Sequence, residues 1–232
     1  METAKEKTTD NRILYENSSC LVLNKRCGED SEKLAVKGLF PVHRLDQPVS
    51  GCQLLAKNRD AAAYLNRLFA LQDCSSKDLN QIIKTYWAIV EKRKLLSGLQ
   101  TNSEGGWIEL SHFVSFDPKQ NKSSAHAAES PGSKNALLRF RVAGSGERYD
   151  FLEIALITGR HHQIRAQLAA VGLHVKGDLK YGSKRSEKNG GIRLHARSLS
   201  FPNPDSRNKL LKVEAPPPEP DALWTAFATC TF

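Results

Sequence analysis

One short segment of the sequence places a carboxylate beside two basic side chains. Asp46 follows His43 and Arg44, and the chain then turns at Pro48 into the apolar run 52–56. A turn that leads into a buried strand holds a carboxylate rigidly, and a neighbouring arginine favours the ionised form, which offsets the opposite effect of burial. Asp46 is therefore a candidate nucleophile or base in a site shielded from water. The alternative is that Asp46 only caps the turn.

An arginine-containing segment further along the chain, residues 158–165, supplies a counter-charge for this carboxylate. Arg160 and Arg165 are the two candidates. Arg165 follows Ile164, an apolar position of a predicted helix, so the stem of Arg165 is expected near the interior. Because a buried guanidinium is very costly without a carboxylate, Asp46 and these arginines predict each other. The alternative is that both arginines are solvated charges on a helix surface.

Tyr86 lies in the segment 84–90, whose alternating positions are largely apolar on both sides. This pattern predicts a central strand that is buried on both faces. Tyr86 is then either a core aromatic or, at the edge of a cleft, a ring that stacks on a nucleobase, an interaction of about 1–3 kcal/mol.

The sequence offers no recognisable metal or cofactor site. Its five cysteines are scattered and form no C-x-x-C pair, which argues against a zinc knuckle or a disulfide framework. His161 and His162 are neighbours, and on a helix they would point about 100° apart, which suits one metal ion poorly. Gly144 and Gly146 lack the rest of a dinucleotide-binding fingerprint. We therefore expect neither a metal nor a cofactor.

The charge balance indicates a polyanionic partner. The chain has 232 residues, with 34 Lys and Arg against 25 Asp and Glu, a net charge of +9. Phosphates attract such an excess at long range, so RNA or DNA is the favoured partner; the alternative is a basic protein without one. No apolar run approaches the ~18 residues that span a bilayer. Residues 1–11 are polar and lack the apolar centre of a signal peptide. We expect a cytoplasmic protein without a membrane partner.

The hydrophobic pattern predicts an α+β fold. We expect residues 1–11 to be a disordered tail and residues 12–232 to be a single domain. Many strands joined by short links favour a mixed, mostly antiparallel central sheet, flanked by helices and loops. Strands are expected at 13–15, 20–24, 52–56, 84–90, 108–116, 136–142, 149–157, 192–196 and 210–213.

Three helices and two polar loops complete the predicted elements. Asn58 is placed to cap a helix that continues to about residue 72. A second helix follows Gly159 and stops at Gly172, and a third follows the proline run near the C-terminus. The segments 97–106 and 117–135 are predicted to be polar loops, the second of them mobile.

Several segments together resemble the pseudouridine synthases of the RluA type. Five motifs occur in the family's order and span most of the chain. They are His43-Arg44-Leu45-Asp46 with Ser50-Gly51 and Ala56-Lys57, then Lys84-x-Tyr86-x-Ala88-x-Val90, Thr158-Gly159-Arg160-x-His162-Gln163-Ile164-Arg165, Gly172-x-x-x-x-Gly177-Asp178-x-x-Tyr181-Gly182, and Leu194-His195-Ala196.

The resemblance implies an isomerase that converts uridine in RNA to pseudouridine in a catalytic cleft across the sheet. Asp46 would attack or deprotonate the ribose of the target uridine. Arg165 would pair with Asp46 and keep it ionised. Tyr86 would lie against the extruded uracil and assist proton removal from C5. The reaction needs no redox step, so no cofactor is implied.

The resemblance also implies an RNA interface. Arg44 would insert where the flipped base leaves the helix, and we expect His43 and Arg160 to contact RNA as well. Transfer RNA and ribosomal RNA both remain open as substrates. We expect a monomer, in the form of the family that lacks an N-terminal S4-like RNA-binding module.

The chain departs from the family pattern at several places: Arg26 follows Lys25 where proline is common, and the link from Lys25 to His43 is short. Residues 47–49 replace those usual before Ser50-Gly51, His161 stands where threonine is common, and 117–135 resembles an insertion. Two other functions stay open: an RNA-binding or RNA-folding protein that has lost catalysis, and a nucleoside or glycoside hydrolase. A hydrolase usually needs two carboxylates, and the sequence gives only Asp46 a convincing setting.

Overall fold

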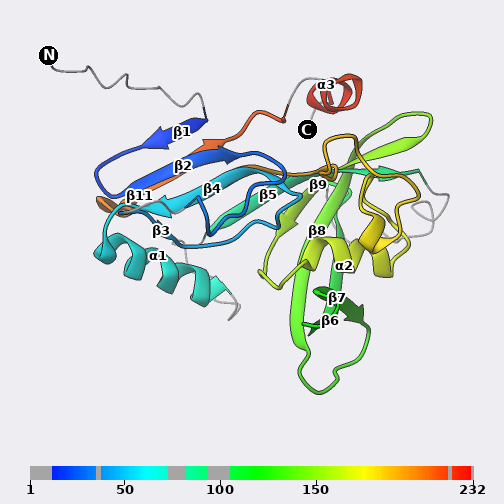
Figure 1. Ribbon diagram of the computed structural model, residues 1–232, viewed down its shortest axis with the longest axis horizontal. Helices are drawn as coiled ribbons and strands as arrows, with labels where there is room; N and C mark the ends of the chain where they lie inside the picture. The colour runs from blue at the N-terminus through cyan, green and yellow to red at the C-terminus, as the bar shows by residue number, and fades with distance from the viewer. Residues whose placement is uncertain (1–11, 35–37, 73–81, 93–104, 219–220, 231–232) are drawn as a thin grey trace, which may run out of the picture.

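The computed structural model describes residues 12–34, 38–72, 82–92, 105–218 and 221–230, and within these ranges the strands join into one sheet (Figure 1). The sheet order is β1-β2-β4-β10-β5-β9-β8-β6-β7, while β11 pairs with β10 and β3 with β4. The strands are β1 (Ile13–Glu16), β2 (Cys20–Lys25), β3 (Phe40–Pro41), β4 (Ser50–Ala56), β5 (Ile83–Glu91), β6 (Ile108–Asp117), β7 (Lys122–His126), β8 (Lys134–Ser145), β9 (Tyr149–Leu156), β10 (Leu194–Asn203) and β11 (Ser206–Glu214).

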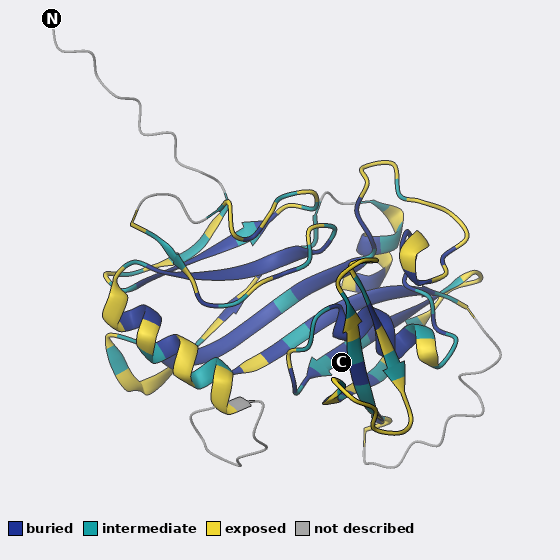
Figure 2. Ribbon diagram, turned by 60° about the horizontal axis from the view of Figure 1, so that its bottom comes forward, coloured by how far each residue is buried: buried dark blue, intermediate teal, exposed yellow. Residues whose placement is uncertain are grey.

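The sheet is mixed and mostly antiparallel, as predicted. Among the described strands, the β4–β10 pair is parallel and the other pairs are antiparallel. The predicted central strand is confirmed, because β5 lies between β10 and β9 and is buried from Tyr86 to Val90. Figure 2 shows these inner strands in dark blue, with exposed residues on the helices and turns around them.

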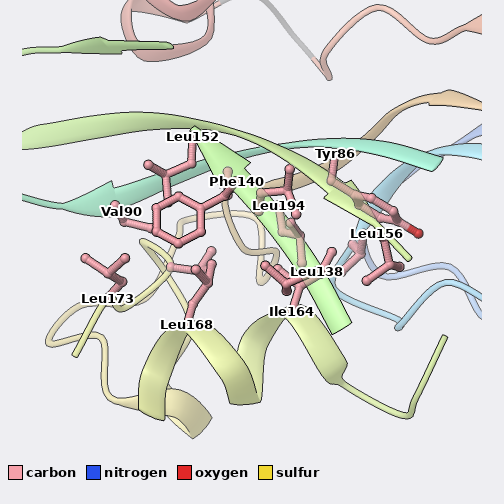
Figure 3. Packing of buried hydrophobic residues seen from close by; sticks show 14 of the residues in the cluster. Tyr86, Val90, Leu138, Phe140, Leu152, Leu156, Ile164, Leu168, Leu173 and Leu194 are labelled. Carbon is pink, nitrogen blue, oxygen red and sulfur yellow. The ribbon is translucent and has the colours of Figure 1, made fainter. Parts of the chain in front are cut away.

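Two helices cover one side of the sheet (Figure 1). The first, α1 (Arg59–Gln72), is capped as predicted, since Asn58 Oδ1 accepts a hydrogen bond of 2.8 Å from Ala61 N. It packs Leu65 against the first half of the sheet. The second, α2 (Gln163–Ala170), directs Ile164 and Leu168 at the underside of the other half, as Figure 3 shows.

A third helix, α3 (Ala222–Ala228), covers the opposite side of the sheet. Asp221 caps it by accepting hydrogen bonds from the backbone N–H groups of Leu223 and Trp224. Its Trp224 and Phe227 pack with Trp87 of β5.

The three predicted helices and the nine predicted strands are confirmed, although α2 begins a few residues after Gly159. In the described residues, no helix has the length and apolar character needed to cross a membrane.

The prediction of a mobile loop at 117–135 is wrong. This segment contains β7, which pairs with β6 in a hairpin at one end of the sheet order, low in Figure 1. Asp117 Oδ1 accepts a 2.8 Å hydrogen bond from Lys119 N in the turn, and Asn121 takes a left-handed φ of 47°. Ser123 is buried although it is polar. Pairing with β6 satisfies backbone N–H and C=O groups of β7. The side chains of β7 are mostly small and polar, so the sequence shows no alternation of apolar residues from which the strand could be predicted.

Some predictions fall outside the described residues. The tail at 1–11 and most of the loop at 97–106 are among them. The single domain at 12–232 stays a prediction.

Candidate active site

One cavity of about 400 Å³ crosses the sheet between α1, β5 and the segment before α2. Leu156, Leu194 and Ile164 give it an apolar wall. The sequence placed six residues in the site, and all of them line this cavity: His43, Arg44, Asp46, Tyr86, Arg160 and Arg165.

The loop that carries Asp46 is held from beneath by a buried ammonium group. Lys25 is 1% exposed, and its Nζ donates to the backbone carbonyls of Asp46 at 3.3 Å, Gln47 at 3.2 Å and Val49 at 2.6 Å. Burial lowers the pKa of Lys25 to about 8. Gln47 also exchanges backbone and side-chain hydrogen bonds with Gly28. The unusual residues at 47–49 thus form an ordered turn that presents Asp46 to the cavity.

The predicted pairing of Asp46 with Arg165 is confirmed. Arg165 Nη1 donates to Asp46 Oδ2 at 3.1 Å, and the Arg165 side chain is 5% exposed. Arg160, the other candidate, instead donates from Nε to the carbonyl of Asn135 at 2.8 Å. The interior stem of Arg165 follows from α2, which buries Ile164 and Arg165 in succession.

A second carboxylate, which the sequence analysis did not assign, completes the ion pair. Asp178 binds Arg165 through two hydrogen bonds, Nε to Oδ2 at 2.7 Å and Nη2 to Oδ1 at 2.9 Å. Its side chain is 1% exposed. Asp178 stands in the Gly177-Asp178 motif, so its position was visible in the sequence, but its contact with Arg165 depends on the tertiary fold. The fork geometry of guanidinium allows one arginine to serve both carboxylates.

His162 is a further residue beside Asp46. Its Nε2 lies 3.7 Å from Asp46 Oδ2, and its backbone has a φ of 51°, which is rare for a residue with a side chain. Burial, and next the charge of Arg165, lower the pKa of His162 to about 3, so its ring is neutral at pH 7. Tyr181 fixes the ring, because its hydroxyl accepts from Ser123 N at 2.9 Å and lies 3.0 Å from His162 Nδ1.

His161 and His162 were expected to lie on a helix with their side chains about 100° apart, and this expectation is wrong. His162 is the N-cap residue of α2 in a left-handed conformation, so His161 precedes the helix and the two rings stack at 3.8 Å. In the part of the chain that the structure describes, no group of three or more His, Cys, Asp or Glu side chains is arranged to hold a metal ion.

Tyr86 is both a core aromatic and a cavity residue. It is 8% exposed, and Figure 3 shows it beside Leu156 and Leu194 at one end of the buried cluster. Burial, and next the charge of Asp46, raise the pKa of Tyr86. The group that faces the cavity at neutral pH is therefore the phenol.

The three residues expected to contact RNA differ in their settings. His43 accepts a 2.9 Å hydrogen bond from Leu54 N and stacks on Phe69, and burial lowers its pKa to about 3. It therefore offers a neutral ring, not a cation. The Arg44 side chain is 60% exposed beside Glu32. Their contact with RNA, and that of Arg160, stays a prediction.

Comparison with known proteins decides the family. The family model of RNA pseudouridylate synthases matches residues 11–170 of this chain. The chain belongs to the RNA pseudouridylate synthase family. An uncharacterised RNA pseudouridine synthase of Bacillus subtilis, YhcT, is 32% identical over 89% of this chain and 68% of the relative. The ribosomal large subunit pseudouridine synthase C of Vibrio parahaemolyticus is 26% identical over 89% of this chain and 66% of the relative. The chain thus spans about two thirds of the length of these two relatives.

Solved structures of this family share the fold. Human RNA pseudouridylate synthase domain containing 1 superposes with a TM-score of 0.66 at 23% identity, covering 89% of this chain and 83% of that one. Human RNA pseudouridylate synthase domain containing 4 gives a TM-score of 0.63 at 20% identity, covering 93% and 90%. The expected family and fold class are confirmed, and relatives that carry this name are isomerases.

Proposed function

We propose that this pseudouridine synthase uses Asp46 as its catalytic carboxylate on a uridine of structured RNA. The observation that carries the proposal is the ion pair in the cavity. Arg165 is buried. Two of its nitrogens donate hydrogen bonds to Asp178, and the third donates to Asp46 at 3.1 Å. The buried guanidinium orients the carboxylate through a charge-assisted hydrogen bond.

The reaction is an isomerisation that balances without a co-reactant. The N1–C1′ bond of uridine breaks, the uracil turns over, and a C5–C1′ bond forms, while the C5 proton is lost and N1 gains one. Asp46 acts on the ribose, as a nucleophile at C1′ or as a base. Both routes need one carboxylate within reach of the sugar.

Tyr86 and Arg165 complete the proposed catalytic set. The neutral phenol of Tyr86 faces the cavity, where it can lie against the uracil ring and exchange a proton near C5. Arg165 stabilises the ionised form of Asp46. Arg44, which is exposed at the cavity rim, is suited to fill the space that the uridine leaves, offsetting part of the unstacking cost of a few kcal/mol.

The proposed substrate is ribosomal or transfer RNA. The net charge of +9 favours a phosphate backbone as partner. One relative, from Vibrio parahaemolyticus, is named for the ribosomal large subunit. We propose that the protein acts in the cytoplasm as a monomer without a cofactor, through one domain at 12–232.

Product analysis tests this function. Purified protein is incubated with unmodified ribosomal and transfer RNA transcripts, and the digested nucleosides are separated by chromatography. Pseudouridine without free uracil is the expected result. Free uracil would favour a hydrolase, which Asp178 argues against because both of its oxygens are bound to Arg165. RNA binding without any new nucleoside would favour a protein that has lost catalysis.

A further inference from the structure

Three aromatic rings form a column that leads from Asp46 to the surface. His162 lies beside Asp46 and stacks on His161 with ring centroids 3.8 Å apart. His161 then contacts Phe116, with centroids 4.2 Å apart and planes inclined by 55°. The Phe116 side chain is large and apolar, and the residue is 47% exposed. The column therefore ends in an aromatic surface open to solvent.

The β6–β7 hairpin fixes the outer end of this column. Phe116 of β6 pairs with Ser123 of β7, and Ser123 Oγ lies 3.1 Å from His161 Nδ1. Ser123 N also donates to the Tyr181 hydroxyl that holds His162. The hairpin and the histidines are thus tied together by hydrogen bonds as well as by ring contacts. The exposed ring is held in place, and ordering it on binding costs little conformational entropy.

The surroundings of this ring suit a phosphate backbone. A second cavity of about 370 Å³ adjoins the first and runs from Asp46 to His161 and Asn121, and it is also lined by Arg44 and Lys180. Lys180 Nζ donates to the carbonyls of Gln120 and Asn121 at the hairpin turn, and Lys122 lies over the Tyr181 ring. Asp30 and Glu32 also line this cavity, and Glu32 pairs with Arg44 at 3.3 Å. Burial lowers the pKa of His161, which keeps the column neutral at pH 7.

We propose that Phe116 is a stacking platform for a nucleobase that neighbours the target uridine in the RNA. The proposal rests on the proposed function, because it takes the occupant of the first cavity to be a uridine. A strand that enters the first cavity continues through the second toward the hairpin, where Lys122 and Lys180 meet its phosphates. Base–aromatic stacking tolerates any base, so the platform fixes the path of the strand more than its sequence.

A binding experiment tests the platform independently of turnover. The probe is a fluorescein-labelled stem–loop RNA with one uridine in its loop, and all proteins carry Asp46→Asn so that no reaction occurs. Phe116→Ala is expected to weaken binding about 5- to 150-fold, the loss of one stacked base. Phe116→Trp retains a ring and is expected to stay within about twofold. Leu210→Ala, at an apolar side chain of β11 that is 54% exposed, is the matched control and is expected to change nothing.

A series of abasic RNAs completes the test. Removing the base that stacks on Phe116 is expected to abolish the difference in affinity between the Phe116→Ala protein and the protein that retains Phe116, whereas removal of other loop bases leaves it. The platform is overturned if Phe116→Ala binds like the Leu210→Ala control, if Phe116→Trp loses as much as Phe116→Ala, if no abasic position masks the difference, or if the RNA does not bind. Failure of the proposed function gives a different result: the protein that retains Asp46 forms no pseudouridine, although the Phe116 variants still differ in RNA affinity as expected.

Discussion

Asp178 holds Arg165 in a two-point contact, with hydrogen bonds of 2.7 and 2.9 Å, on the side of the guanidinium away from the cavity. This contact leaves Nη1 of Arg165 to reach Asp46 at 3.1 Å. Asp178 is a positioning residue, because it acts on Asp46 only through Arg165. The guanidinium is fixed before any RNA enters the cavity.

Asp178→Asn is therefore expected to impair turnover more than substrate binding. The guanidinium loses its charged anchor, so kcat should fall at least about tenfold with KM nearly unchanged. The free energy of unfolding should fall by about 3 kcal/mol, since a buried pair is broken. Tritium release from RNA labelled at uridine C5 and urea denaturation measure the two effects. In the control Glu109→Gln, the lost pair with Arg139 is exposed, and the cost should stay below about 1 kcal/mol. A purely structural role for Asp178 would lower stability and leave kcat intact.

The lowered pKa of Lys25 predicts a loss of activity at alkaline pH. Its ammonium offers three N–H groups to the loop carbonyls, whereas the neutral amine offers two. Because burial lowers the pKa of Lys25 to about 8, kcat should decline as the pH rises through that value. Lys25→Met should show a low kcat that no longer declines there. A decline near pH 8 that persists in Lys25→Met would assign the titration to another group.

Three neutral histidines predict a fold that weakens in mild acid. Burial lowers the pKa of His43 and His162 to about 3 and that of His195 to about 4, from 6.5. Below pH 6.5 these histidines bind protons in the unfolded chain but stay neutral in the folded chain. The free energy of unfolding therefore falls as the pH drops from 6.5 toward 4. Urea midpoints between pH 7.5 and 4.5 measure the slope. His43→Gln keeps an acceptor without titrating, and should give a shallower fall; an unchanged slope would contradict this assignment.

Gly51 is expected to tolerate no side chain. It joins the Asp46 loop to β4 with a φ of 113°, and a Cβ there would overlap the backbone of Ala196 in β10. Gly51→Ala should lower the free energy of unfolding by more than the ~1–3 kcal/mol of backbone strain alone. Gly132→Ala is the matched control, because Gly132 has a φ of 80° with nothing within 4 Å of a Cβ. Equal losses in urea denaturation would show that the close approach of Ala196 is unimportant.

Local signals explain why much of this site was predictable. Asp46 and Arg165 each stand in a segment whose turn or helix pattern is strong, and a buried guanidinium requires a carboxylate. Tyr86 follows from a strand that is apolar on both faces. The local pattern left Arg160 and Arg165 both open as partners of Asp46, and left Tyr86 either a core aromatic or a cleft residue. The choice of Arg165 and the catalytic role of Tyr86 came from the resemblance to the RluA-type synthases.

Residues that act through tertiary contacts were named in motifs but given no role. Asp178 and Tyr181 reach Arg165 and His162 because the chain after α2 folds back through Gly177 and Gly182, both with positive φ. No periodicity marks such a return. The β7 strand was missed for a related reason, since its stability comes from backbone pairing with β6 and its side chains are mostly polar.

The most direct test of the central claim is the rate of tritium release from C5-labelled RNA by Asp46→Asn under single-turnover conditions. Asn preserves the shape of the side chain, and thermal unfolding checks that the fold is retained. We predict a rate at least about a thousandfold below that of the unchanged protein, a difference of about 4 kcal/mol in the barrier. A folded Asp46→Asn protein that releases tritium within about tenfold of the normal rate would contradict the assignment of Asp46 as the catalytic carboxylate.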